Sequence, residues 1–269
     1  MVAVDHDALQ EISSRMSRAF DVSGQRVLLV GGASGLGEAM ACGFSTLGAR
    51  VAVADVNLEK AEGLASVLNH MGGEVSAWQL DVQKTDDVAS RIAEIAKSLG
   101  GLDTAVNLAG INDRRPALDL DSAAFSRILA VNLEGVYACA RAEGAVMTQA
   151  GSGSIINISS IYAFAPAQNQ APYAASKGGV LSLTRVLANE WATKGVRVNA
   201  LVPGPILTPL SRANLVDDPD TRAWMEARIM RHRAGEPSEI VGPAVFLASD
   251  AASFVTGVGL PVDGGWLAA

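Results

Sequence analysis

Short apolar runs alternate with longer segments of helical character from residue 25 to near the C-terminus, and this alternation constrains the fold more than any other feature. Strands that alternate with helices of about ten or more residues are typical of parallel βαβ units. Helices then cover both faces of the sheet, so we predict one doubly wound α/β domain. Strands are expected over 26–30, 50–54, 75–80, 104–107, 154–158, 196–201 and 259–261, with helices over 58–71, 86–99 and 173–193 and in the stretches that end near residues 47 and 150.

The composition excludes several functional classes. The chain has 269 residues, of which 49% are hydrophobic and 18% charged, so it can bury a large core. Its net charge of −7 argues against nucleic acid and anionic membrane as partners. We expect no transmembrane helix and no signal peptide, because Asp5, Asp7 and Glu11 interrupt the first apolar stretch. Two distant cysteines, Cys42 and Cys139, and three scattered histidines predict a cytoplasmic protein without a disulfide framework or a metal site.

The first 22 residues differ from the rest of the chain. Apolar side chains recur there at helical spacing, at Leu9, Ile12, Met16 and Phe20, with polar residues between them. This pattern predicts a short amphipathic helix over residues 1–22, followed by a single dinucleotide-binding catalytic domain over 23–269. A packing or oligomer-contact arm is favoured over a membrane-surface anchor, which would carry more lysines.

A glycine-rich loop follows the first predicted strand and opens the first helix of the domain. It contains Gly31, Gly35 and Gly37, which let the backbone approach a pyrophosphate closely at the positive end of the helix. The second strand ends at Asp55, eighteen residues after Gly37. An acid at that position accepts a hydrogen bond from the ribose 2′-hydroxyl and repels a 2′-phosphate, which favours NAD over NADP. Asp81 ends the third strand, where it is expected to accept a hydrogen bond from the adenine amino group.

Taken together in chain order, these and later motifs resemble the short-chain dehydrogenase/reductase family over about residues 22–267. The matching positions are Gly31, Gly35, Gly37, Asp81, Val82, Asn107, Leu108, Ala109, Gly110, Asn132, Ser160, Tyr173, Ser176, Lys177, Pro203, Gly204, Thr208 and the stretch Val262, Asp263, Gly264 and Gly265. The resemblance implies a Rossmann-type, seven-stranded parallel sheet in the order 3-2-1-4-5-6-7 and a homotetramer. Two positions depart from the family pattern: Val30 replaces a common threonine, and Leu108 replaces a common asparagine.

The resemblance also implies four catalytic residues, Asn132, Ser160, Tyr173 and Lys177. Tyr173 and Lys177 are four residues apart on a predicted helix and so share a face, where the lysine is expected to lower the pKa of the tyrosine. Such a phenol can give or take the proton while hydride moves to or from nicotinamide. Ser160 is expected to hold the substrate oxygen, with Ser159 as the rival position. Asn132 is expected to anchor a water that connects Lys177 to solvent.

The same resemblance assigns a set of residues to the cofactor. The full expected set is Gly31, Ser34, Gly35, Leu36, Gly37, Asp55, Asp81, Val82, Asn107, Leu108, Ala109, Gly110, Tyr173, Lys177, Pro203, Gly204, Ile206 and Thr208. Ile206 is expected to bind the carboxamide through its backbone, and Thr208 to reach the phosphates.

The substrate is predicted less directly. Arg114 and Arg115 follow the fourth strand, where arginines can bind a carboxylate or vicinal hydroxyls. This segment is locally similar to the gluconate 5-dehydrogenase, 2-deoxygluconate 3-dehydrogenase and polyol dehydrogenase subgroup. We therefore expect NAD-dependent oxidation of a sugar acid, sugar or polyol. The alternatives are a ketone reductase of the 3-oxoacyl type that uses NADPH or NADH, and a cofactor-binding regulator without catalysis. The substrate loop over 208–235 carries five arginines and four acids, which favours a solvated helix over an anion clamp.

Overall fold

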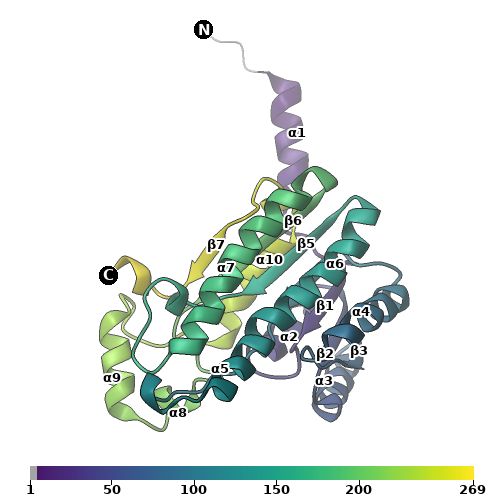
Figure 1. Ribbon diagram of the computed structural model, residues 1–269. Coiled ribbons are helices and arrows are strands. Elements are labelled where there is room, and N and C mark those ends of the chain that lie inside the picture. The colour runs from purple at the N-terminus through teal and green to yellow at the C-terminus, as the bar shows by residue number, and fades with distance from the viewer. Residues whose placement is uncertain (1–4) are drawn as a thin grey trace.

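A seven-stranded parallel sheet forms the centre of the molecule in the computed structural model, which describes residues 5–269 (Figure 1). Its strand order is β3-β2-β1-β4-β5-β6-β7, so the predicted number, direction and order of strands are confirmed. The strands are β1 (Arg26–Val30), β2 (Arg50–Asp55), β3 (Glu74–Gln79), β4 (Thr104–Asn107), β5 (Gly153–Ile158), β6 (Val196–Pro203) and β7 (Gly259–Val262).

Helices cover both faces of this sheet, as predicted. They are α2 (Leu36–Thr46), α3 (Leu58–His70), α4 (Thr85–Leu99), α5 (Ser122–Leu129), α6 (Val136–Ala150), α7 (Ala171–Trp191), α8 (Arg212–Leu215), α9 (Pro219–Arg228) and α10 (Val241–Ala248). Strand β1 shows how the two layers arise, because successive side chains of a strand point to opposite faces. Val27 and Leu29 join the core beneath α2, α3 and α10, whereas Leu28 and Val30 join the core beneath α4, α6 and α7.

The strand order reverses between β1 and β4, and this reversal positions the site. Crossovers from β1 and β4 leave toward opposite sides of the sheet, so a crevice opens at the carboxyl ends of these two strands. The glycine loop after β1 and the segment after β4 therefore face each other across that crevice.

Several elements differ from the sequence-based boundaries. Helix α7 begins at Ala171, two residues before the expected start, because Pro172 occupies its first turn, where a missing N–H costs nothing. A π-helical segment (Ala130–Gly135) joins α5 to α6 in one continuous helical region. The substrate loop folds into α8 and α9 and carries surface ion pairs such as Arg222–Glu226, at 2.9 Å.

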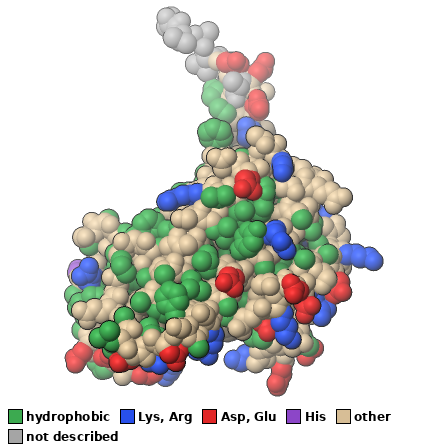
Figure 2. All heavy atoms as spheres, in the orientation of Figure 1, with side chains coloured by type: hydrophobic (Ala, Val, Ile, Leu, Met, Phe, Trp, Pro, Cys, Tyr) green, Lys and Arg blue, Asp and Glu red, His purple; other side chains and the backbone are tan. Residues whose placement is uncertain are grey.

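An additional helix, α1 (His6–Met16), stands away from the domain (Figures 1 and 2). Leu9, Ile12 and Met16 are more than half exposed on it, and the chain rejoins the body where the Phe20 ring lies 6.3 Å from that of Phe246. Residues 1–4 of the expected arm lie outside the described residues, and the division at residue 22 stays a prediction. Among residues 5–269, none of the helices combines the length and apolar character needed to cross a membrane.

Candidate active site

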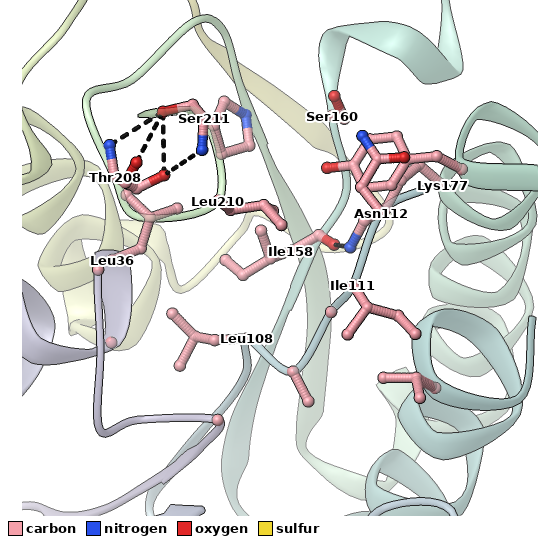
Figure 3. Close-up of a pocket in the computed structure, with 18 of the residues that line it drawn as sticks. Leu36, Leu108, Ile111, Asn112, Ile158, Ser160, Lys177, Thr208, Leu210 and Ser211 are labelled. Carbon is pink, nitrogen blue, oxygen red and sulfur yellow. Dashed lines mark hydrogen bonds between the residues drawn. The ribbon is translucent and has the colours of Figure 1, made fainter. Parts of the chain in front are cut away.

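A cavity of about 390 Å³ opens at the carboxyl ends of the strands (Figure 3). Its walls come from the loops that follow β1, β2, β3, β4, β5 and β6, together with residues of α7, α8 and α9. Segments that are distant in sequence therefore meet in one space, as expected for a parallel sheet whose loops emerge at one edge.

The glycine loop forms one wall of the cavity. A Cβ atom on Gly31, whose φ is +76°, would lie 2.6 Å from the backbone nitrogen of Ala109, and one on Gly37 would lie 2.6 Å from the Cα of Gly32. Neither position can hold a side chain without moving backbone. The loop leads into α2, which begins at Gly35 without a side-chain cap. The positive end of that helix is thus available to an anionic group.

Two acids mark the next part of this wall. Asp55 lines the cavity at the end of β2, but its carboxylate also holds the loops around it. It accepts hydrogen bonds from the backbone nitrogens of Ala33, at 3.1 Å, and Asn57, at 3.0 Å. Asp81 and Val82 line the cavity further along. Asp55 therefore has a structural role whatever else it binds.

The segment after β6 lies beside the glycine loop, where a Cβ on Gly35 would be 3.4 Å from the Cβ of Thr208. Pro203, Gly204, Ile206 and Thr208 all line the cavity, as does Ser211, which our sequence analysis missed. The Ser211 hydroxyl accepts a hydrogen bond from the Thr208 nitrogen at 3.0 Å, and the two hydroxyl oxygens lie 3.2 Å apart. In Figure 3 these two residues lie across the cavity from Ser160 and Lys177.

The expected proton-transfer residues lie together at the inner end of the cavity. Ser160 and Tyr173 both line it, and the Ser160 hydroxyl acts to lower the pKa of the phenol. Lys177 is buried one turn further along α7, with its Nζ 5.6 Å from the centre of the Tyr173 ring. Ser159 has a different task, because its buried hydroxyl donates to the backbone oxygen of Lys177 at 2.9 Å. This geometry favours Ser160 over Ser159 as the group that faces a substrate.

The expected low pKa of Tyr173 is not found. Burial raises the pKa of Tyr173 to about 12, more than the hydrogen bond from Ser160 and the charge of Arg114 lower it. Burial also lowers the pKa of Lys177 to about 8, and its ammonium donates to the Ile158 carbonyl at 2.7 Å. The lysine is therefore directed to a backbone oxygen and does not by itself produce a tyrosinate.

Asn132 lies in the π-helical segment and is fully buried. Its Oδ1 accepts from the Ile111 nitrogen at 2.8 Å, and its Nδ2 donates to the Ile111 oxygen at 2.9 Å. A Cβ on Gly110 would lie 3.6 Å from both Asn132 Oδ1 and Lys177 Nζ, so these two polar groups approach the same point. π-helical turns inside α-helices are frequent at functional sites. This one places the asparagine against the loop that follows β4.

Asn107 corrects one of our sequence-based expectations. Leu108, Ala109 and Gly110 line the cavity, whereas Asn107 does not. Its side chain is buried at the carboxyl end of the central strand β4. Its Nδ2 donates to Glu143 Oε2 at 3.0 Å and to Asn157 Oδ1 at 3.1 Å. The residue ends a strand whose side chains alternate between faces, so its amide points away from the cavity. Its contribution is to the core beneath α6.

The two arginines after β4 separate into different roles, which is a second correction. Arg115 does not line the cavity and binds Asp113 with Nε and NH2, at 2.9 and 2.7 Å. Arg114 does line it, beside Asn112 and Tyr162, and Gln170 contacts Arg114 from the turn before α7. Our sequence analysis missed Asn112, Tyr162 and Gln170 as neighbours, because none of the three belongs to a recognisable motif.

Comparison with known proteins agrees with this arrangement. A family model described as enoyl-(acyl carrier protein) reductase matches residues 31–267. A D-threitol dehydrogenase from Mycolicibacterium smegmatis is 38% identical over 247 residues, which cover 92% of this chain and 94% of that one. The chain belongs to the short-chain dehydrogenase/reductase family. Members of this kind are oxidoreductases that act on CH–OH groups, and the expected family assignment is confirmed.

Two further relatives extend the comparison. The 5-keto-D-gluconate 5-reductase of Escherichia coli is 35% identical over 254 residues, covering 94% of this chain and 100% of the relative. A crystal structure of a gluconate 5-dehydrogenase from Burkholderia cenocepacia, in complex with NADP and tartrate, is 37% identical and has a TM-score of 0.90. That match covers 93% of this chain and 98% of the other.

Proposed function

We propose that this short-chain dehydrogenase/reductase oxidises a secondary hydroxyl group of a sugar acid, sugar or polyol with NAD⁺, or reduces the corresponding ketone. The observation that carries the proposal is the convergence of two sites in one cavity. A glycine loop with an acid at the next strand end lies on one side, and Tyr173, Ser160 and Lys177 lie on the other. The named activities of the similar proteins support the substrate class.

The cavity fits a dinucleotide by its own geometry. Gly31 and Gly37 let the loop fold tightly against neighbouring backbone at positions where a Cβ would clash, and the uncapped start of α2 lies on the same loop. Gly31, Ser34, Gly35, Leu36, Gly37, Asp55, Asp81, Val82, Leu108, Ala109, Gly110, Pro203, Gly204, Ile206 and Thr208 would hold the group. When bound, NAD accepts the hydride from an alcohol, and NADH donates it to a ketone.

We propose NAD as the preferred cofactor, although the Burkholderia relative was crystallised with NADP. The carboxylate of Asp55 would repel a 2′-phosphate, and its neighbours Ser34 and Val56 carry no positive charge to bind one. The test is the ratio of kcat/KM for NAD⁺ and NADP⁺. A tenfold or larger preference for NADP⁺ would contradict the assignment.

The protein's own groups account for the proton. With a pKa of about 12, the Tyr173 phenol is protonated at neutral pH and can donate its proton to a ketone oxygen held by Ser160. In the oxidative direction the phenol must first lose that proton. The polar ends of Lys177 and Asn132 approach the same point beside Gly110, and these are the groups through which we expect the proton to leave. The oxidative rate would then depend on how readily Tyr173 loses its proton once substrate binding has changed the water and the charges around it.

The experiment tests aldonic acids, sugars, polyols and simple secondary alcohols as substrates with NAD⁺. Turnover of each is measured from the absorbance of the NADH that forms. The wild type is compared with Tyr173→Phe, which keeps the ring and removes the hydroxyl. Turnover with a polyhydroxy substrate that the variant lacks would support the proposal. A second panel contains 3-oxoacyl thioesters with NADPH. Turnover confined to that panel would instead favour the ketone reductase. Absence of turnover in both panels would favour the non-catalytic regulator.

We also propose a cytoplasmic homotetramer. Support for a reducing compartment comes from the cysteines, which are both free and lie on opposite faces of the sheet. Support for the tetramer comes from the family resemblance. Light scattering on the purified protein would test it, and a monomer at micromolar concentration would refute it.

A further inference from the structure

We propose that Gln170 is a specificity-determining positioning residue, which orients Arg114 as an uncompensated cation for a carboxylate group of the substrate. This inference rests on the proposed function and deepens it, because it selects hydroxy acids over neutral sugars and polyols. It is carried by the contacts of Gln170 and by a contrast between two adjacent arginines.

Gln170 makes a two-point contact with Arg114. The amide lies in the turn before α7 and is 2% exposed. Because a guanidinium offers only donors, we assign the Gln170 amide with its oxygen toward Arg114, where that oxygen accepts from Nε at 2.8 Å and from NH2 at 3.1 Å and the amide nitrogen faces Asn112. The preceding residue, Asn169, has a φ of +61°, which is uncommon for a residue with a side chain and concentrates at functional sites. Asparagine adopts this left-handed conformation more readily than most residues with a side chain, and here it turns the chain just before Gln170.

This contact orients the guanidinium without neutralising it. Arg115 next to it is bound in the same two-point manner, but by the carboxylate of Asp113, so that pair carries no net charge. Within residues 5–269, no carboxylate lies within 4.0 Å of the Arg114 guanidinium. An arginine presents five N–H donors, and Gln170 occupies only the edge formed by Nε and NH2. Tyr162 also contacts Arg114, but neither an amide nor a phenol neutralises the guanidinium, so its positive charge remains for a ligand.

The charge of Arg114 acts at the reacting end of the cavity. Burial raises the pKa of both Tyr173 and Tyr162, and in each case the charge of Arg114 opposes that rise. The two tyrosine rings meet edge to face, with centroids 6.3 Å apart. A substrate with its hydroxyl at Tyr173 therefore also lies within the electrostatic reach of Arg114. A polyol offers this cation only weak acceptors, whereas a carboxylate offers a charge-assisted pair.

The test exploits an isosteric change. Gln170→Glu keeps the length and the acceptor oxygen of the side chain but adds a negative charge, which pairs with Arg114 as Asp113 pairs with Arg115. The probes are D-gluconate and D-glucitol, which differ at one end in a carboxylate and a hydroxymethyl group. We expect the ratio of kcat/KM for gluconate to that for glucitol to fall by about 10- to 100-fold, mainly through KM. Arg114→Gln should shift this ratio in the same direction, and Arg115→Gln, the matched control, should leave it unchanged.

The outcomes separate this inference from the proposed function. If the wild type oxidises glucitol but not gluconate, or if Gln170→Glu and Arg114→Gln leave the ratio unchanged, the inference is wrong and the enzyme class stands. If the wild type oxidises neither probe, titration calorimetry of gluconate and tartrate into the NAD⁺-saturated protein tests the inference alone. Binding that Gln170→Glu weakens about tenfold or more supports the inference, and absent or unaltered binding overturns it. Tm and NAD⁺ affinity check that each variant is folded.

Discussion

Glu143 is a buried acid whose titration should dominate the pH dependence of stability. It lies on α6, completely buried, and burial raises its pKa from 4.5 to about 8, more than the hydrogen bond from Asn107 lowers it. Cys139, one turn earlier, is the neighbouring titratable group, and its own pKa is raised by burial and by Glu143. Among the described residues, neither Glu143 Oε1 nor Asn107 Oδ1 has a hydrogen-bond partner. Protonation of Glu143 at Oε1 converts one of these two acceptors into a donor, which the ionised carboxylate lacks.

The sign and size of the effect follow from proton linkage. Because the folded state binds the Glu143 proton more tightly than the unfolded state, this contribution is fully present below the unfolded pKa of 4.5 and is lost as pH rises to about 8. Each pH unit in that window costs about 1.4 kcal/mol, so the free energy of unfolding should fall by about 3 kcal/mol between about pH 5 and pH 7.5. Glu143→Gln stays neutral and its amide supplies a permanent donor. The variant should lack this slope.

The assay is urea unfolding of the wild type and Glu143→Gln at several pH values, at one protein concentration and without cofactor. The difference in the free energy of unfolding between the two proteins should grow with pH in favour of the variant. Glu62→Gln, at an exposed position on α3, is the control and should follow the wild type. Parallel curves for the wild type and Glu143→Gln would refute the reasoning, since they would mean that folding does not shift the pKa of Glu143 from its unfolded value.

Three further predictions concern the cavity. Tyr173→Phe should lower kcat by about two to four decades with little change in NAD⁺ affinity, because it removes the general acid/base; near-normal turnover would exclude that role. Asp55→Asn keeps an acceptor for Ala33 but removes the charge, and should improve kcat/KM for NADP⁺ relative to NAD⁺ by about tenfold; an unchanged ratio would leave Asp55 with its structural task alone. Lys177→Met should abolish turnover yet raise the free energy of unfolding at pH 7 by about 2 kcal/mol, because burial lowers the lysine pKa to about 8. That gain should disappear as pH rises from about 8 toward 10.5, where the unfolded lysine also loses its proton, and a gain that persists there would argue against the linkage.

Lys177 is needed for the proposed reaction, but burying its ammonium group lowers the free energy of unfolding. An ammonium group buried beneath Tyr173 is held by one carbonyl, that of Ile158, and is otherwise desolvated. Asn132 is buried nearby but satisfies its amide against Ile111, so its cost is lower. The lysine is therefore the group for which stability and function conflict most directly.

Sequence patterning was sufficient for the fold and for the backbone of the site. The alternation of strands and helices, together with the family resemblance, predicted all seven strands and their order. Glycine positions such as Gly31 and Gly37 were readable because only glycine fits where two backbones approach within van der Waals distance. Helix spacing was enough to bring Tyr173 and Lys177 to one face.

Side-chain partners and environments were less predictable. Asn107 belongs to a motif that lines the cavity, but its own side chain points into the core toward Glu143. The expected low pKa of Tyr173 is not found because burial raises it, with Ser160 and Arg114 as the groups that oppose the rise, and burial depends on everything packed around the residue. No local pattern distinguishes Arg114 from Arg115.

The sequence by itself determined the alternation of strands and helices, the glycine loop and the spacing of the proton-transfer residues, because each depends on local periodicity or on a backbone constraint; the order of the strands came from the family resemblance. The tertiary structure decided which charges remain free. Asp113 is adjacent in the chain to Arg114, yet its carboxylate pairs with Arg115 two residues away and neutralises it. Gln170 comes from a distant turn and contacts Arg114 without neutralising it. The sequence does not reveal which of the two arginines keeps its charge, because that depends on how the two loops pack.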